Sequence, residues 1–295
     1  MSHRIHLALQ LLVLVLSIGI ISSAALAEDK SSAQTVEQAI ERARIAALAE
    51  GKSQAVQFPS VKGEKIELVG YLRRPDGAGP FPAVILLHGC AGDWPGMDTR
   101  WGARLVKWGY VALSVDSFGP RGIKSVCGGG ESFDRVFDAY AALSFLAAQP
   151  SVAPDRIAVM GVSGGATVAL WDVERDFIEN SFKHKFRGAI ALYPSCAATT
   201  WAMTVPTLIL IGELDDLTPA AACREMVKRV SNSPNGREGA PVRLRVYPGA
   251  YHAFDNTRFR TGQRFLGQHW LEYNAGATME SVKEIRNFLR NNLGD

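Results

Sequence analysis

The sequence predicts an α/β protein with a mostly parallel central sheet and helices on both faces. Two observations predict this fold class. Short apolar runs alternate with longer amphipathic segments along most of the chain, and the runs lack the polar alternation of strands with one face in water. Such an alternation of strands and helices is typical of a doubly wound sheet. Because no internal repeat or Pro-rich linker interrupts it, we expect a single domain over residues 61–295.

The expected strands are short runs rich in β-branched and aliphatic side chains. They cover residues 83–87, 111–115, 157–162, 189–193, 208–211 and 242–247. Amphipathic segments between and after these runs predict the helices, at about 101–108, 133–148, 166–177, 219–230 and 278–291. In a sheet of this kind the functional groups gather beyond the carboxyl ends of the strands.

Composition and charge exclude several classes of protein. The chain has 295 residues, 47% of them hydrophobic, and a mean hydropathy of +0.02, which excludes a disordered, collagen-like or multi-span membrane protein. Its 32 Lys and Arg residues against 29 Asp and Glu residues leave a formal charge of only +3. This charge is too small for an electrostatic nucleic-acid footprint, so we expect no DNA or RNA partner.

The first 27 residues have the pattern of a secretory signal peptide. An apolar run at 7–21 precedes Ala25-Leu26-Ala27, and acidic residues follow. We expect cleavage after Ala27 and a periplasmic or secreted protein. The alternative is an uncleaved membrane anchor, since the run is only slightly shorter than the roughly 20 residues of a bilayer span. Residues 28–60 are expected to form an N-terminal helical extension, with its helix at 33–50.

The four cysteines are interpreted through this expected export. An even number of cysteines in an oxidising compartment suggests disulfides. We favour Cys90 with Cys127 and Cys196 with Cys223, because each pair follows neighbouring elements of the predicted sheet. The alternative is four free thiols. The sequence lacks C-x-x-C and H-x-x-x-H spacings, so no metal is expected.

A possible nucleophile follows the strand predicted at 157–162. The pentapeptide Gly161-Val162-Ser163-Gly164-Gly165 lies between that strand and a predicted helix. In such a turn the glycines allow close backbone packing, and the serine hydroxyl is raised into the open. Ser163 is therefore the candidate nucleophile.

An acid and a base follow later strands. Asp215 and Asp216 come after the strand at 208–211, and His252 follows the strand at 242–247. The order Ser, Asp, His is that of one class of hydrolases with a nucleophile, an orienting acid and a general base. Spacing alone does not separate the adjacent carboxylates, and either one could instead cap the next helix.

A hydrolase of this kind also needs a pair of hydrogen-bond donors for the oxyanion that forms when the serine attacks a carbonyl. The loop His88-Gly89-Cys90 follows the first long apolar strand, where such hydrolases place a backbone N–H. We assign the donors to the main-chain N–H groups of Cys90 and Gly164. The side chain of Cys90 is then expected to be incidental to catalysis, and His88 is expected to help fix the loop.

These motifs resemble those of the dienelactone hydrolase family of α/β-hydrolases. The resemblance rests on LLHGCAG, VDSFGPRG, GVSGG, GELDDLTP and YPGAYHAFD, and it spans about residues 82–255. It implies the α/β-hydrolase fold, and it implies that Ser163, Asp215 and His252 are the nucleophile, acid and base. The family pattern G-x-x-D-x-x-x-P selects Asp215 rather than Asp216.

The chain also departs from this family. Dienelactone hydrolases proper use a cysteine nucleophile where this chain has Ser163. They carry a glutamate at the position of Gly89, and an arginine that helps to hold the substrate carboxylate at the position of Asn256. Arg121 is a candidate for meeting an anionic substrate group. The resemblance therefore implies a serine hydrolase of carboxylic esters rather than an enzyme for dienelactone.

The leading functional hypothesis is an exported serine hydrolase that cleaves a small-molecule ester through an acyl-enzyme. A peptidase or amidase with the same three residues is one alternative, because the motifs do not define the leaving group. A non-catalytic exported binding protein on the same scaffold is the other. No dinucleotide-binding fingerprint is present, and we expect no cofactor. The sequence does not determine the oligomeric state.

Overall fold

The computed structural model describes residues 53–61, 66–129, 134–175, 177, 179–197, 199, 202–232 and 239–294. The expected signal peptide at 1–27 and the expected helix at 33–50 lie outside these residues. Within the part of the chain that the structure describes, no helix is long and apolar enough to cross a membrane.

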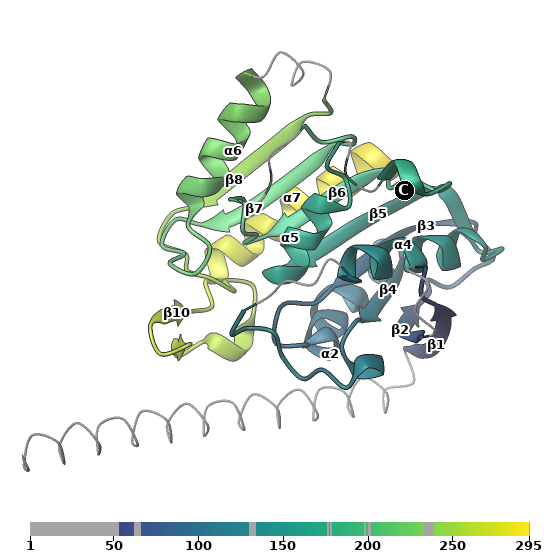
Figure 1. Ribbon diagram of the computed structural model, residues 1–295, viewed down its shortest axis with the longest axis horizontal. Coiled ribbons are helices and arrows are strands. Elements are labelled where there is room, and N and C mark those ends of the chain that lie inside the picture. Colours follow the sequence, from purple (N-terminus) through teal and green to yellow (C-terminus); the bar gives the residue numbers. More distant parts are fainter. Residues whose placement is uncertain are drawn as a thin grey trace, which may run out of the picture. The chain divides into compact units, whose positions relative to one another are not determined.

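The centre of the structure is an eight-stranded sheet with the order β1-β2-β4-β3-β5-β6-β7-β8 (Figure 1). Strands β3 to β8 run parallel to one another, while β2 pairs antiparallel with both β1 and β4. The strands are β1 (Gln54–Pro59), β2 (Glu67–Arg73), β3 (Phe81–Leu87), β4 (Val111–Asp116), β5 (Val152–Val162), β6 (Gly188–Leu192), β7 (Thr207–Gly212) and β8 (Val242–Tyr247). The predicted α/β fold with a mostly parallel sheet is confirmed.

Helices cover both faces of this sheet. The helix α5 packs on β5 and β6 from one face, and α7 packs on β5, β6 and β7 from the other (Figure 1). The α-helices are α2 (Trp94–Met97), α3 (Ala103–Lys107), α4 (Asp134–Ala147), α5 (Gly164–Trp171), α6 (Ala220–Asn232) and α7 (Ala275–Leu293). Shorter helical turns are η1 (Asp98–Gly102), η2 (Gly119–Arg121), η3 (Glu179–Ser181) and η5 (Thr257–Phe259).

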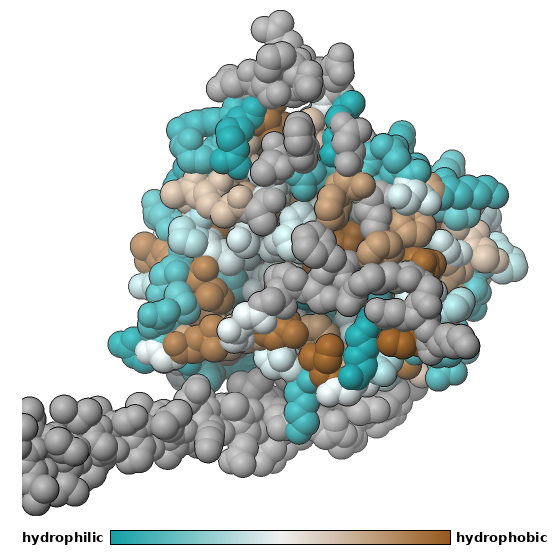
Figure 2. Space-filling view, in the orientation of Figure 1, coloured by the Kyte–Doolittle hydropathy of each residue, from teal (hydrophilic) through white to brown (hydrophobic). Residues whose placement is uncertain are grey.

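The strands β6 and β7 are buried along their whole length because helices cover both faces of the sheet there. Every residue of β6 and β7 is buried, as expected from their uninterrupted apolar runs. On the face of the molecule in Figure 2, hydrophilic and hydrophobic residues are interspersed. The exposed large hydrophobic side chains of the described residues are Val61, Ile123, Phe177, Leu214, Leu266 and Met279.

The structure adds strands that the apolar runs do not predict. Strand β1 lies at Gln54–Pro59, within the stretch expected to be a helical extension, so the sheet begins before residue 61. The reason is its position at the sheet edge, where only Phe58 of β1 is buried. A hairpin of β9 (Gln263–Phe265) and β10 (His269–Leu271) also follows the expected base, and its strands are too short to give a periodic signal.

Two predicted helices differ from those in the structure. The helix expected at 166–177 ends at Trp171, because Glu174 pairs with Met203 in a β-bridge and Arg175 N–H donates to Ala202 O at 2.8 Å. The helix expected at 101–108 is divided between the π-helical turn η1 and α3. Gly102 lies at this division, close to the buried carboxylate of Asp98.

Both disulfides join the pairs that the sequence favours. Cys90 is bonded to Cys127, and Cys196 is bonded to Cys223. Structural disulfides of this kind are typical of extracellular or periplasmic proteins. They therefore agree with the expected export, whereas the signal peptide itself stays a prediction.

Candidate active site

Ser163 stands on a sharp turn between β5 and α5. Its backbone has φ 52° and ψ −122°, a positive φ that side chains other than glycine rarely adopt. The strained turn is held because Ser163 N–H donates to Leu192 O of β6 at 2.9 Å, and Ser163 O accepts from Ala166 N–H at 2.9 Å. The surrounding structure thus keeps the serine at the end of the strand, where its hydroxyl is accessible.

The glycines around Ser163 allow two close backbone contacts. A Cβ atom at Gly161 would overlap Gly165 O, and one at Gly165 would overlap Leu87 O and His88 O. The start of α5 therefore packs directly on the chain that leaves β3. This contact brings the N-terminus of α5 next to the loop at Gly89.

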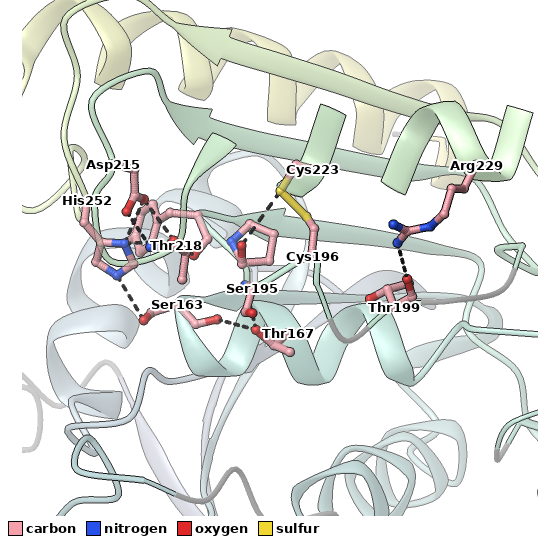
Figure 3. The surroundings of a disulfide bond; sticks show 12 residues. Ser163, Thr167, Ser195, Cys196, Thr199, Asp215, Thr218, Cys223, Arg229 and His252 are labelled. Carbon is pink, nitrogen blue, oxygen red and sulfur yellow. Dashed lines mark hydrogen bonds and ion pairs between the residues drawn. A yellow bond between two sulfur atoms is a disulfide. The ribbon is translucent and has the colours of Figure 1, made fainter. Parts of the chain in front are cut away.

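Ser163, His252 and Asp215 form a continuous chain of hydrogen bonds (Figure 3). The distance from Ser163 Oγ to His252 Nε2 is 3.0 Å, and the distance from His252 Nδ1 to Asp215 Oδ2 is 2.8 Å. The His252 and Asp215 side chains are 4% and 0% exposed. The structure thus brings together the three residues that the sequence selects from widely separated positions.

The acid and histidine loops are packed against each other. Leu214 N–H donates to Ala250 O at 2.9 Å, and Glu213 N–H donates to Tyr247 O at 2.9 Å. A Cβ at Gly212 would overlap Ala250 O, so only glycine permits this approach. The two loops therefore hold Asp215 and His252 at a defined separation.

Thr218 is a further polar contact of this chain. Its Oγ1 lies 3.0 Å from Asp215 Oδ2, 3.1 Å from Tyr193 O and 3.2 Å from His252 Nδ1. Figure 3 shows Thr218 beside the Asp215–His252 pair. The other oxygen of Asp215, Oδ1, accepts the backbone N–H groups of Leu217 and Thr218.

An aromatic residue and a second carboxylate support the histidine. The ring of Tyr193 lies edge-on to that of His252, with 4.6 Å between their centroids. Tyr193 OH donates to Asp255 Oδ1 at 2.7 Å, and Trp101 Nε1–H donates to Asp255 Oδ2 at 2.8 Å. Burial, together with the nearby Asp255, raises the pKa of Tyr193 well above its ordinary value, so the phenol remains a neutral donor.

The loop after β3 lies against the serine. A Cβ at Gly89 would be 3.4 Å from Ser163 Cβ, in ordinary van der Waals contact. His88 is 1% exposed, and its Nε2 accepts Ser117 N–H at 3.3 Å. Nδ1 then carries the proton and donates to Gly89 O at 2.7 Å.

Arg135 holds the loop after β3 through His88 O and helps to keep His88 neutral. It is 2% exposed, donates to His88 O and lies over the ring of Phe118, which in turn packs edge-on against His88. Burial and the Arg135 charge lower the pKa of His88 to about 3, although the bond to Gly89 O opposes this shift. Both effects keep His88 neutral, while the Ser117 N–H on Nε2 leaves its proton on Nδ1, where it holds Gly89 O.

Comparison with known proteins identifies the family. The model of the "Dienelactone hydrolase family" matches residues 68–293. The chain belongs to this family.

A known relative of the chain agrees with this assignment to a hydrolase family. "Putative hydrolase YtaP" of Bacillus subtilis (strain 168) is 26% identical over 246 residues, which cover 65% of this chain and 80% of YtaP.

Two solved structures show the same fold. A dienelactone hydrolase-like promiscuous phosphotriesterase from metagenomic libraries has a TM-score of 0.65 at 18% identity, covering 82% of this chain and 98% of its own. Propionate-bound esterase 2 of Thermogutta terrifontis has a TM-score of 0.61 at 17% identity, covering 81% and 94%. At such low identity these neighbours show the fold alone.

Three residues singled out in the sequence have structural partners in this dienelactone hydrolase family member. Arg121 forms a bidentate ion pair with the buried Asp138 at 2.8 Å and also donates to Ser117 O, which favours a structural role over contact with a substrate anion. Asn256 is 8% exposed and its side chain caps η5. Asp216 accepts Trp270 N–H of β10 at 3.1 Å.

The sequence motifs by themselves assign no role to Thr218 or Asp255. Both lie inside quoted motifs, GELDDLTP and YPGAYHAFD, so a signal was present. Only the fold brings Thr218 to the carboxylate of Asp215, and Asp255 to the hydroxyl of Tyr193. Among the described residues, no group of three or more His, Cys, Asp and Glu could hold a metal ion.

Proposed function

We propose that this hydrolase cleaves carboxylic esters of small molecules in two steps, through an acyl-enzyme on Ser163. The observation that carries the proposal is the hydrogen-bonded chain from Ser163 Oγ through His252 to Asp215, at 3.0 and 2.8 Å. Such a chain activates a serine hydroxyl, which is a poor nucleophile alone. The family assignment supports hydrolysis as the type of reaction.

In the first step His252 Nε2 accepts the proton of Ser163 Oγ as that oxygen attacks the ester carbonyl. Negative charge then develops on the carbonyl oxygen, and in this scheme the N–H groups of Cys90 and Gly164 receive it. Asp215 accepts the Nδ1–H of the resulting imidazolium. His252 returns its proton to the alcohol that leaves, and Ser163 retains the acyl group.

In the second step water replaces the alcohol. His252 takes a proton from the water as it attacks the acyl-enzyme, the same N–H groups receive the charge, and the acid is released as Ser163 regains its proton. The donors to Asp215 keep that carboxylate oriented throughout. No other titratable group is required by this scheme.

We also propose that the protein works outside the cytoplasm, in a periplasm or beyond the cell. The expected signal peptide at 1–27 and the two disulfides support this location. N-terminal sequencing of protein recovered after expression of the full chain should give Glu28 as the first residue. Retention of residues 7–21 would favour the membrane anchor instead.

Replacing the nucleophile tests the reaction directly. Ser163→Ala should lower kcat on a simple ester by on the order of 10⁴-fold or more, as in other hydrolases with such a chain. A fluorophosphonate should label the wild-type protein at Ser163 and leave this variant unlabelled. Ser195→Ala is the matched control, because Ser195 contacts Thr167 through its backbone N–H rather than its hydroxyl.

The same measurements separate the alternatives. A preference for an amide over a matched ester would displace the esterase proposal in favour of a peptidase or amidase. Absence of labelling in folded wild-type protein would favour a binding protein. Near-normal ester turnover by Ser163→Ala would show that the proposed nucleophile is wrong.

A further inference from the structure

The Cys90–Cys127 disulfide lies at the proposed oxyanion site. Cys90 supplies one of the proposed donors, and its side chain is expected from the sequence to be incidental to catalysis. We propose instead that Cys127, through its bond to Cys90, and His88 act as positioning residues that hold the Cys90 N–H toward the reacting carbonyl. This inference rests on the proposed function.

One side of the donor peptide is held by His88. The peptide group between Gly89 and Cys90 carries both Gly89 O and Cys90 N–H. Gly89 O accepts His88 Nδ1–H at 2.7 Å and Gly92 N–H at 3.3 Å. Because C=O and N–H of a trans peptide point in opposite directions, holding Gly89 O also sets the direction of Cys90 N–H.

The other side of Cys90 is held by one short segment, residues 122–129. Val126 N–H donates to Cys90 O at 2.9 Å, and Cys127 Sγ is bonded to Cys90 Sγ. This segment contains no helix or strand, and residues 122–125 are exposed, including Ile123 at 37%. Backbone hydrogen bonds such as Ile123 N–H to Phe118 O at 3.1 Å hold the start of the segment, but burial contributes little there. The covalent bond supplies a restraint that burial does not.

The second disulfide has a different environment. Cys196 and Cys223 are both 0% exposed and join the loop after β6 to α6 (Figure 3). Cys90 and Cys127 are only partly buried. Since a reductant reaches exposed disulfides more readily, Cys90–Cys127 should be the first to be reduced. The chain thus contains a matched internal control.

A loosened oxyanion donor has a specific kinetic signature. The donor contacts negative charge that exists only when the carbonyl becomes tetrahedral, so its displacement lowers kcat and leaves KM nearly unchanged. A disulfide with a merely structural role would instead reduce the fraction of folded, active molecules. Counting active sites separates these two effects.

The experiment compares Cys90→Ser/Cys127→Ser with Cys196→Ser/Cys223→Ser. Active sites are counted by fluorophosphonate, which forms a bond from phosphorus to Ser163 Oγ and releases fluoride. Complete loss of an oxyanion donor costs about 10²- to 10³-fold in kcat, so a displaced one should cost on the order of 10-fold per active site. The second pair of substitutions should leave kcat per active site within about twofold of wild type.

Reduction of wild-type protein provides a test that needs no folded variant. Graded dithiothreitol, which is oxidised to its cyclic disulfide, should convert Cys90 and Cys127 to thiols first, as mapped by alkylation and mass spectrometry. The loss of kcat per active site should follow this modification and reverse on reoxidation.

An unchanged kcat per active site, in the Cys90→Ser/Cys127→Ser protein or after selective reduction, would overturn the inference. Wild-type protein that neither reacts with fluorophosphonate nor cleaves an ester would overturn the proposed function itself. The two failures are therefore distinguishable.

Discussion

The carboxylate of Asp215 is held by four donors. Oδ1 accepts the N–H groups of Leu217 and Thr218 at 3.1 and 2.8 Å, and Oδ2 lies 3.0 Å from Thr218 Oγ1 and 2.8 Å from His252 Nδ1. These bonds lock the orientation of the acid and stabilise its charge. The neighbouring Asp216 is half-exposed and faces β10 instead, so local geometry separates two carboxylates that spacing alone cannot.

Thr218→Val tests the contribution of one of these donors. The substitution keeps the side-chain shape and removes a hydrogen bond to a charged group, worth about 1.5 to 3 kcal/mol, so kcat should fall about 10-fold or more with KM little changed. Thr218→Ser should retain most activity. Equal kcat in the Val variant and wild type would contradict this role.

His88 makes the protein sensitive to acid. Its pKa is about 3 in the folded protein and near 6.5 in an unfolded chain, so between these values the unfolded chain binds the extra proton. The stability that neutral His88 contributes is complete above about pH 6.5 and is lost as the pH falls toward 3.

His88→Asn isolates this effect. Urea unfolding of wild type should show a loss of about 2 kcal/mol from His88 between pH 6.5 and pH 5, at about 1.4 kcal/mol per pH unit. The variant lacks the titrating group. Its free energy of unfolding should therefore fall by about 2 kcal/mol less than that of wild type between pH 6.5 and pH 5. An identical pH dependence in both proteins would show that His88 is not held neutral.

At the scale of elements, the site depends on how closely α5 approaches the end of β3. Gly165→Ala would drive a methyl group into Leu87 O and His88 O, which belong to backbone and cannot move aside easily. We expect a loss of about 1 to 3 kcal/mol or more in the free energy of unfolding, with reduced ester turnover. Thermal or urea unfolding measures it.

Gly128→Ala is the matched control for this substitution. A Cβ there would meet nothing within 4 Å, and Gly128 does not have a positive φ. Its stability should stay within about 0.5 kcal/mol of wild type. If Gly165→Ala were equally neutral, the close packing of α5 on β3 would not be needed for the fold.

The predicted strands agree best with the observed ones where the strand is completely buried. The run at 208–211 identifies β7 because both faces of that strand are covered, and a fully buried strand needs apolar residues throughout. Strand β1 and the β9–β10 hairpin lie at edges or loops, where few positions are buried and composition carries little signal. The early end of α5 at Trp171 depends on pairing with Met203, a contact distant in sequence.

At the scale of the whole molecule, the two disulfides restrain different parts of the fold. Cys196–Cys223 joins the loop after β6 to α6 across 27 residues, beside loops that carry Tyr193 and Asp215. Removing this restraint increases the number of unfolded conformations. On the chain-entropy model this lowers the free energy of unfolding by about 3 to 4 kcal/mol.

Cys196→Ser/Cys223→Ser should therefore unfold at lower urea concentration, with a free energy of unfolding reduced by about 3 to 4 kcal/mol. Because this disulfide is buried, the reductant concentrations that open Cys90–Cys127 should leave it intact. A variant as stable as wild type would indicate that the native packing alone restrains these loops.

The sequence by itself determined the positions of the six parallel strands β3 to β8 and the identity of Ser163, Asp215 and His252 as candidates. These features follow from local patterns: uninterrupted apolar runs, a glycine-flanked serine, and polar residues at strand ends. Only the tertiary structure decided which groups Thr218, Asp255 and His88 contact. It also decided that Arg121 forms an ion pair with Asp138, and that the Cys90 disulfide lies at the proposed oxyanion site. The physical reason is that hydrogen-bond partners and burial are set by contacts between segments far apart along the chain, which no local pattern records.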